Sequence, residues 1–229
     1  MTNSDQYTDE MLNSMQTTYG AGFLSPGGAQ ETRQMVEGLS VSGCDVLDLG
    51  CGMGGAAQVL VNELAANHVT GVDVEEKQIT TARKLVANAG LSSKITIKQV
   101  SSSPLPFANE TFHIIITKDV VSHIPDRLAC FADMYRLLKP GGVLVVADWL
   151  RGKSNEDGLF DTWAGQLAAG GLVFYFEPVE VYVDLMKQVG FSKVITTDLR
   201  RTERLSHGHV RQHLHLHPYK ELHLMGQLP

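Results

Sequence analysis

The chain contains 229 residues, of which 43% are apolar and 19% are charged, and its net charge is −6. This length suits one α/β domain of ordinary size, and the apolar fraction can supply a buried core, which excludes disorder, collagen and coiled coil. The negative charge argues against a general nucleic-acid binder, because affinity for the phosphate backbone comes from clustered Lys and Arg.

The first ten residues and the cysteines bear on the compartment. The opening MTNSDQYTDE has neither a basic nor an apolar stretch, so no secretory signal is expected. No apolar run approaches the roughly 18–20 residues of a membrane span. Cys44, Cys51 and Cys130 are an odd number without framework spacing, which suits reduced thiols. We therefore expect a soluble cytoplasmic protein, monomeric or homodimeric, with neither nucleic acid nor a membrane as partner.

Strand-like and helix-like patterns alternate along most of the chain. Two helices are expected first, at 5–17 and 29–39, with a glycine-rich loop between them at 19–28. Repetition of strand, helix and strand then predicts right-handed crossovers and a parallel sheet. The expected strands are 44–50, 69–74, 94–100 (alternating, as at an edge), 112–118 (apolar on both faces, hence central), 143–148 and 192–199. The expected helices between them are 54–66, 76–90, 127–142 and 178–191.

The fold class is therefore α/β, with a doubly wound, mostly parallel sheet and an N-terminal helical lid. We expect seven strands, or six if neither HLHLH (213–217) nor ELHLM (221–225) supplies the last one. Six of the nine histidines lie between 207 and 223, but a solvated strand or tail is favoured over a metal site, and no metal is predicted. The expected units are 1–40 (lid), 41–150 (α/β core), 151–177 (an insertion) and 178–229 (helix, strand and His-rich tail).

A glycine-rich turn, DLGCGMGG (48–55), follows the first strand. Glycines let the backbone approach a ligand closely, and the helix that follows offers free N–H groups. Parallel sheets of this kind bind ligands beyond the carboxyl ends of their strands. Asp73 ends the second strand, where a carboxylate can accept hydrogen bonds from ribose hydroxyls. The sequence therefore predicts a ribose-containing ligand at this edge of the sheet.

Four motifs, VLDLGCGMGG (46–55), GVDV (71–74), SPLPF (103–107) and LLKPGGVLVVAD (137–148), together closely resemble the class I S-adenosylmethionine-dependent methyltransferases. The resemblance implies that Gly50, Gly52 and Gly54 approach the methionine part of the donor and that Asp73 holds its ribose. Ser101 stands where the family usually has an Asp that contacts adenine, so that contact departs from the pattern. The other predicted donor-binding residues are Leu24, Ser25, Asp48, Cys51, Val74, Ser102 and Lys118.

The segments QYTDE (6–10), YGAGFLSPGG (19–28) and DVVSH (119–123) are similar to the phosphoethanolamine N-methyltransferases. That resemblance implies a catalytic pair of Tyr7 and His123, with Leu24 and Ser25 lining the donor and Asp119 near the reacting amine. An amine must be neutral to accept a methyl group, and a His with an ordinary pKa near ~6.5 can take up its proton. The implied acceptor is a small-molecule amine.

The insertion departs from that family, whose members grip phosphate there with tyrosines and an arginine. Residues 161–177 contain no Lys or Arg, and a buried phosphate without a cation is strongly disfavoured. We therefore predict a phosphate-free amine as the acceptor. Aromatic residues suggest a pocket suited to a methylated ammonium or a flat apolar acceptor, although two of them, Phe174 and Phe176, are expected in the core. These aromatic residues are Trp149, Trp163, Phe174, Tyr175 and Phe176.

Other activities compete with this hypothesis. The shared donor domain also suits transfer to oxygen or carbon of a small metabolite, or to phosphoethanolamine itself. The glycines fit a dinucleotide as well as a methyl donor, but Asp48 and KPGG (139–142) argue against a nicotinamide-dependent oxidoreductase. A non-catalytic module that binds the donor product is the third class, and Tyr7, Asp119 and His123 argue against it.

Overall fold

The structure is a computed structural model that describes residues 8–101, 104–151, 162, 165, 168–169, 173–198 and 219–228. Tyr7, Ser102, Trp163 and the HLHLH segment lie outside the described residues. Within them, seven strands form one sheet in the order β3-β2-β1-β4-β5-β7-β6. The strands are β1 (Asp45–Leu49), β2 (His68–Asp73), β3 (Ile95–Gln99), β4 (Phe112–Lys118), β5 (Leu138–Arg151), β6 (Lys193–Asp198) and β7 (Tyr219–Gln227).

The sheet is mostly parallel, as its sequence pattern predicts. β1 pairs in parallel with β2 and β4, while β3 extends β2 and β5 extends β4. β7 is antiparallel to both β5 and β6 and lies between them. The seven-stranded alternative is therefore correct, and ELHLM belongs to the last strand. The edge position of β3 and the central position of β4 are also confirmed.

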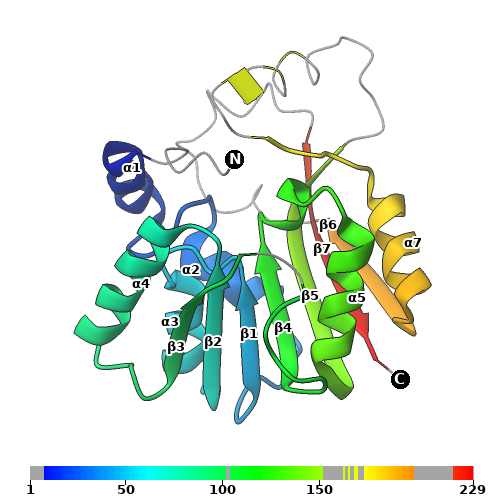
Figure 1. Cartoon of the computed structure of the whole chain (residues 1–229), viewed down its shortest axis with the longest axis horizontal. Coiled ribbons are helices and arrows are strands. Elements are labelled where there is room, and N and C mark those ends of the chain that lie inside the picture. The colour runs from blue at the N-terminus through cyan, green and yellow to red at the C-terminus, as the bar shows by residue number, and fades with distance from the viewer. Residues whose placement is uncertain are drawn as a thin grey trace.

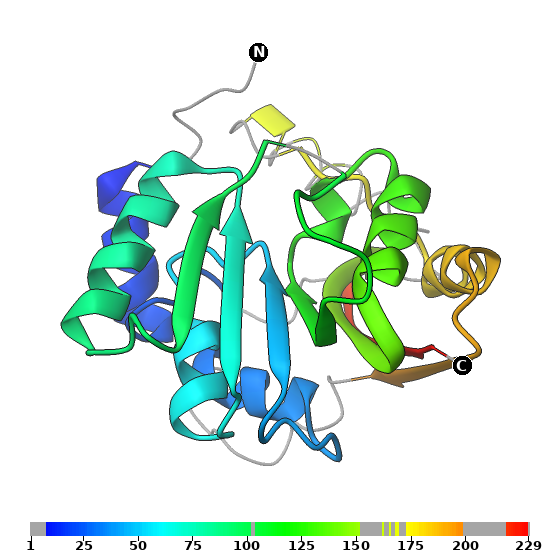
Figure 2. The same cartoon turned by 60° about the horizontal axis from the view of Figure 1, so that its bottom comes forward.

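Helices cover both faces of the sheet (Figures 1 and 2). One face packs against α5 (Arg127–Leu137) and α7 (Val179–Val189), with Phe131 and Tyr182 among its buried side chains. The other packs against α2 (Gly28–Met35), α3 (Gly55–Asn62) and α4 (Glu76–Asn88). Consecutive residues of β1 alternate between the two cores, Val46 in one and Leu47 in the other, so both faces of this strand are buried.

The boundary between α5 and β5 differs from the prediction. The helix ends at Leu137, because Leu138 already pairs with Phe112 of β4. The strand then continues through KPGG, where Gly141 has a φ of +75° and the register against β4 shifts. Pro140 and Gly141 therefore lie in an irregular part of the strand, not at the end of a helix. A bulge accommodates them there, since an extra residue bends one strand against its partner.

The first described helix, α1 (Asp9–Tyr19), begins where the Thr8 side chain accepts a hydrogen bond from the Met11 N–H at 3.2 Å. It ends at Tyr19, because the next residue, Gly20, has a φ of +104°, which is incompatible with an α-helix. α2 starts at Gly28 and ends at Met35, before the expected residue 39. Met35 lies in the core beside α3, so α2 belongs to the layer of helices that covers the sheet.

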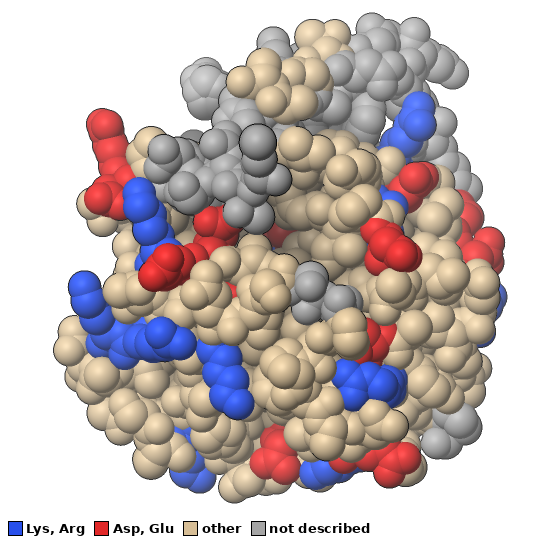
Figure 3. All heavy atoms as spheres, in the orientation of Figure 1, with Lys and Arg blue, Asp and Glu red and all other residues tan. Residues whose placement is uncertain are grey.

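Acidic and basic side chains are interspersed over the described face of the molecule shown in Figure 3. Among the described residues, no helix combines the length and the apolar character needed to cross a membrane.

Candidate active site

The carboxyl ends of the parallel strands meet at the upper edge of the sheet in Figure 1, near α1 and the short 3-10 helix η1 (Val121–His123). The glycine turn connects the end of β1 to α3 there. Gly50 and Gly54 have φ angles of +75° and +81°, which residues other than glycine rarely adopt. A Cβ atom at Gly50 would also collide with Val120. The backbone N–H groups of Gly50 and Cys51 both donate to the Val72 carbonyl, at 2.8 and 3.0 Å.

Asp73 anchors this turn from the end of β2. Its Oδ2 accepts a hydrogen bond from the Gly52 N–H at 2.9 Å, and its Oδ1 accepts one from the Glu75 N–H at 3.0 Å. A carboxylate has about four lone-pair sites, so both oxygens can accept further donors. Burial raises the pKa of Asp73. Burial and the Asp73 charge raise the pKa of Asp48, at the same edge, to about 7.

The loop between α1 and α2 lies on the glycine turn. The Gly55 N–H donates to the Gly22 carbonyl at 3.1 Å. Leu24 covers Gly52 so closely that a Cβ atom there would lie 3.2 Å from Leu24 Cδ1. Leu24 and Ser25 are thus next to the predicted donor site, although nearly 30 residues separate them from the turn in the sequence.

A buried cluster of charges ties that loop to the end of β4. Lys118 Nζ donates to Ser25 Oγ at 2.7 Å and to the Pro26 carbonyl at 3.0 Å. It also pairs with Glu31 Oε2 at 2.9 Å and with Asp119 Oδ2 at 2.7 Å. Burial disfavours the ammonium group, but the two carboxylates outweigh it and raise the pKa of Lys118. Lys118 therefore joins the loop to the sheet and partly neutralises Asp119.

Asp119 directly follows β4 in the chain, and His123 ends the short helix η1 four residues later. Asp119 has a left-handed φ of +56°, and its N–H donates to the Ala147 carbonyl at 2.9 Å. His123 Nδ1 lies 2.7 Å from the Val173 carbonyl oxygen. A carbonyl only accepts, so Nδ1 carries the proton in neutral His123 and the lone pair is on Nε2. Burial lowers the pKa of His123, although the Val173 bond and the Asp119 charge oppose this.

Two aromatic residues of the insertion lie beside this histidine. The Phe174 ring centroid is 4.0 Å from that of His123, and Phe174 stacks on Phe176 at 4.8 Å with the rings 9° from parallel. Both are half-buried at the site, so the prediction that they belong to the core is wrong. Tyr175, between them, is 42% exposed, and the aromatic acceptor pocket stays a prediction.

The structure brings together most of the predicted site residues at one edge of the sheet. Val74, the residue after Asp73, is 54% exposed, and Ser101 is exposed beyond the end of β3. Sequence reasoning missed buried polar residues at this edge, among them Glu31, Ser122 and Asp148. The sequence gives no signal for their burial, because each is paired with a residue distant in the chain.

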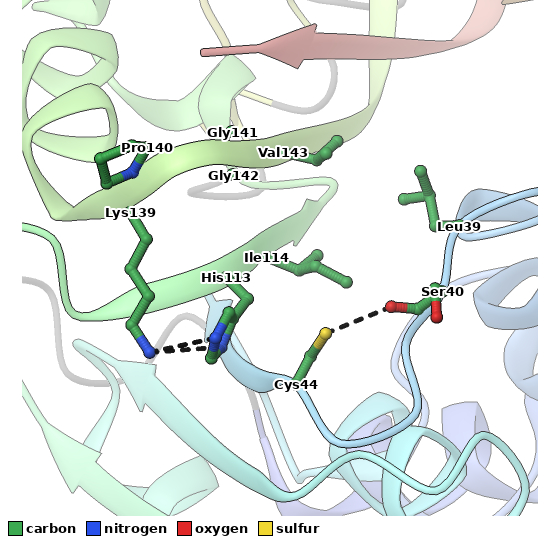
Figure 4. Close-up of a pocket in the computed structure, with 10 residues that line it drawn as sticks. All are labelled: Leu39, Ser40, Cys44, His113, Ile114, Lys139, Pro140, Gly141, Gly142 and Val143. Carbon is green, nitrogen blue, oxygen red and sulfur yellow. Dashed lines mark hydrogen bonds between the residues drawn. The ribbon is translucent and has the colours of Figure 1, made fainter. Parts of the chain in front are cut away.

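A separate pocket of about 220 Å³ lies at the opposite edge, among the starts of β1, β4 and β5 (Figure 4). Lys139 Nζ lies 3.2 Å from His113 Nε2 there and 3.3 Å from Asp45 Oδ2. The Cys44 thiol donates to the Ser40 carbonyl at 3.2 Å. Because the sheet separates this pocket from the glycine turn, it takes no part in the site built above.

The fold and the glycine turn define an α/β protein that binds its ligand at the carboxyl ends of its strands. A family model described as a methyltransferase domain matches residues 40–166, and the chain belongs to this family. The resemblance seen in the sequence is thereby confirmed.

Curated relatives are similar to this chain over most of its length. Phosphoethanolamine N-methyltransferase 1 of Arabidopsis thaliana is 28% identical over 84% of this chain, and methyltransferase GfsG of Streptomyces halstedii is 31% identical over 79%. The chain spans 38% of the first protein and 65% of the second.

Among solved structures, phosphoethanolamine N-methyltransferase 2 of Haemonchus contortus, in complex with phosphomonomethylethanolamine and S-adenosylhomocysteine, superposes with a TM-score of 0.83 at 20% identity. The match covers 98% of this chain and 59% of that one, and it shows that the two share a fold.

Proposed function

We propose that this chain is an S-adenosylmethionine-dependent methyltransferase that methylates the nitrogen of a small-molecule amine. Membership of the methyltransferase domain family supports the reaction class. The observation that carries the choice of nitrogen is a carboxylate near a proton acceptor. Asp119 can attract an ammonium group, and His123 Nδ1 is committed to the Val173 carbonyl, which leaves Nε2 as a proton acceptor. Within the first 40 residues, α1 and the loop after it act as the lid, while α2 packs in the layer of helices over the sheet. Tyr7 remains a predicted partner of His123.

The residues of the site fit a positively charged donor. Asp48, Asp73 and Asp119 gather around one edge, and the Asp48 Oδ2 and Asp119 Oδ1 atoms are buried without a hydrogen-bond partner among the described residues. Bound S-adenosylmethionine would supply an electrophilic methyl group on a sulfonium. Gly50, Gly52 and Gly54 would lie against it, and Asp73 would accept hydrogen bonds from its ribose.

The acceptor nitrogen needs a free lone pair, so its ammonium form must first lose a proton. Asp119 attracts the ammonium group through Oδ1, while its Oδ2 stays paired with Lys118. His123 Nε2 then takes the proton, and the lowered pKa of His123 keeps this nitrogen unprotonated at neutral pH. The aromatic rings beside it suit a methylated ammonium through cation–π attraction.

Two candidate acceptors remain. The names of the relatives favour phosphoethanolamine. A phosphate-free amine is favoured by the insertion, because residues 161–177 contain no Lys or Arg to neutralise a phosphate. We prefer the phosphate-free amine. Oxygen and carbon acceptors use the same donor domain and can also give up a proton to a base, but they carry no positive charge for Asp119 to attract.

An acceptor screen with isotopically labelled donor tests this proposal. The panel holds phosphate-free primary, secondary and tertiary amines, phosphoethanolamine, and phenol and enol acceptors. We expect label transfer to at least one phosphate-free amine. Transfer confined to phosphoethanolamine would overturn the assignment of the acceptor, and transfer confined to phenols or enols would overturn N-methylation.

A further inference from the structure

A fully buried carboxylate, Asp148 of β5, lies behind the turn that carries His123. Its Oδ2 accepts a hydrogen bond from the Ser122 N–H at 2.7 Å, and its Oδ1 accepts one from Ser122 Oγ at 2.6 Å. The Trp149 N–H donates to Oδ1 at 2.8 Å, and the Tyr182 hydroxyl lies 3.4 Å from Oδ2. Asp148 has no exposed surface, so it cannot itself touch an acceptor molecule.

Ser122, the residue before His123, is held on two sides. Asp148 holds its N–H and its hydroxyl, while its carbonyl accepts a hydrogen bond from the Tyr175 N–H at 2.6 Å. Val173, two residues before Tyr175, accepts the bond from His123 Nδ1. The insertion and β5 therefore both hold this short turn, and the orientation of the imidazole depends on both.

We propose that Asp148 is a positioning residue for His123. By holding Ser122 through two hydrogen bonds, it keeps the turn where Nδ1 meets the Val173 carbonyl and Nε2 carries the lone pair. The catalytic part of this inference rests on the proposed function, in which His123 is the proton acceptor. A small displacement of a proton acceptor lowers turnover strongly, because proton transfer needs heavy atoms within hydrogen-bond reach.

The two oxygens of Asp148 each face a backbone N–H, one from Ser122 and one from Trp149. Asparagine has the same shape but only one acceptor oxygen. Whichever way its amide turns, the NH₂ group points at one of these N–H donors. Asp148→Asn therefore breaks a backbone contact of this carboxylate without creating a cavity.

Asp133 offers a matched control away from the turn. It is also a buried carboxylate, it accepts a hydrogen bond from the Leu105 N–H at 2.6 Å, and it pairs with Arg136 at 2.6 Å. Asp133→Asn makes the same chemical change within the core. Both variants should lower the free energy of unfolding, and only Asp148→Asn should affect His123.

The experiment compares wild type, Asp148→Asn and Asp133→Asn by urea unfolding, by S-adenosylhomocysteine binding, by turnover and by the imidazole ¹⁵N spectrum of His123. For Asp148→Asn we expect kcat to fall at least about tenfold, with the dissociation constant of S-adenosylhomocysteine within about twofold of wild type. The Nδ1–H tautomer of His123 should lose population. Asp133→Asn should keep the wild-type kcat and tautomer.

A folded Asp148→Asn variant with wild-type kcat and tautomer would overturn the proposal, and so would equal losses in Asp133→Asn. If Asp148→Asn does not fold, Ser122→Ala replaces it, because this change removes the 2.6 Å bond and keeps the backbone bond. The ¹⁵N comparison needs no acceptor. If wild type methylates no amine, the proposed function fails, and the tautomer shift still decides whether Asp148 positions His123.

Discussion

Replacing Asp73 with Asn tests whether this carboxylate shapes the donor site. Each of its oxygens accepts a hydrogen bond from a backbone N–H, from Gly52 at 2.9 Å and from Glu75 at 3.0 Å. The asparagine NH₂ group must face one of these donors, and the charge that strengthens bonds to a ribose is lost. A hydrogen bond to a charged group contributes about 1.5–3 kcal/mol. We therefore expect the affinity for S-adenosylhomocysteine to fall about 10- to 150-fold.

Isothermal titration calorimetry measures this change, and Glu75→Gln is the control. Glu75 is close in sequence and the substitution removes the same charge, but only the backbone of Glu75 contacts Asp73. We expect Glu75→Gln to bind S-adenosylhomocysteine as wild type does. Equal affinity of Asp73→Asn and wild type would refute the ribose assignment. An equal loss in both variants would show that net charge, and not the geometry of Asp73, controls binding.

Three further changes test the charges of the site. Lys118→Met removes the cation that pairs with two mostly buried carboxylates, Glu31 and Asp119. Urea unfolding should then show that the free energy of unfolding falls by about 3–5 kcal/mol. A fall below about 1 kcal/mol would contradict the role of the cluster. His123→Ala should lower kcat about 10²- to 10⁴-fold and leave the affinity for S-adenosylhomocysteine unchanged. In the wild type, the acidic limb of the pH profile of kcat/KM should have its midpoint below pH 6.5, because burial lowers the pKa of His123. An unchanged kcat in His123→Ala would exclude this residue from the chemistry. The pKa of Asp48 is raised from 3.8 to about 7, so the folded state binds the carboxyl proton more tightly than the unfolded state does. The stability that this proton contributes is lost as the pH rises through that window. Asp48→Asn should therefore flatten the fall in the free energy of unfolding between about pH 4 and about pH 8, and an unchanged slope would contradict the raised pKa.

Local patterns in the sequence determined most of the fold. The apolar runs around Val46, Ile115 and Val145 are long enough for buried strands and are separated by helical periodicity, which leaves a parallel sheet as the consistent solution. The last strand was harder to place, because β7 lies between β5 and β6, so β5 pairs with β7 and not with β6, the next strand in the chain. Its partners are set by long-range pairing, and no short pattern encodes that.

In the site, too, local sequence patterns were predictable and long-range contacts were not. The glycine turn and Asp73 were predictable, since their backbone requirement appears as residue type at fixed spacing. The partners of Lys118 and His123 were not, because the Glu31 carboxylate and the Val173 carbonyl come from distant segments. A backbone carbonyl has no sequence signature at all, and the tautomer of His123 could be assigned only from the structure.

A crystal structure of the chain with S-adenosylhomocysteine tests the central claim most directly. The account predicts the ligand at the carboxyl ends of β1 and β2, with its ribose hydroxyls on Asp73 and its sulfur on the side that faces His123. Ligand bound instead at the amino ends of the strands, between Lys139 and Cys44, or absent at saturating concentration, would contradict it.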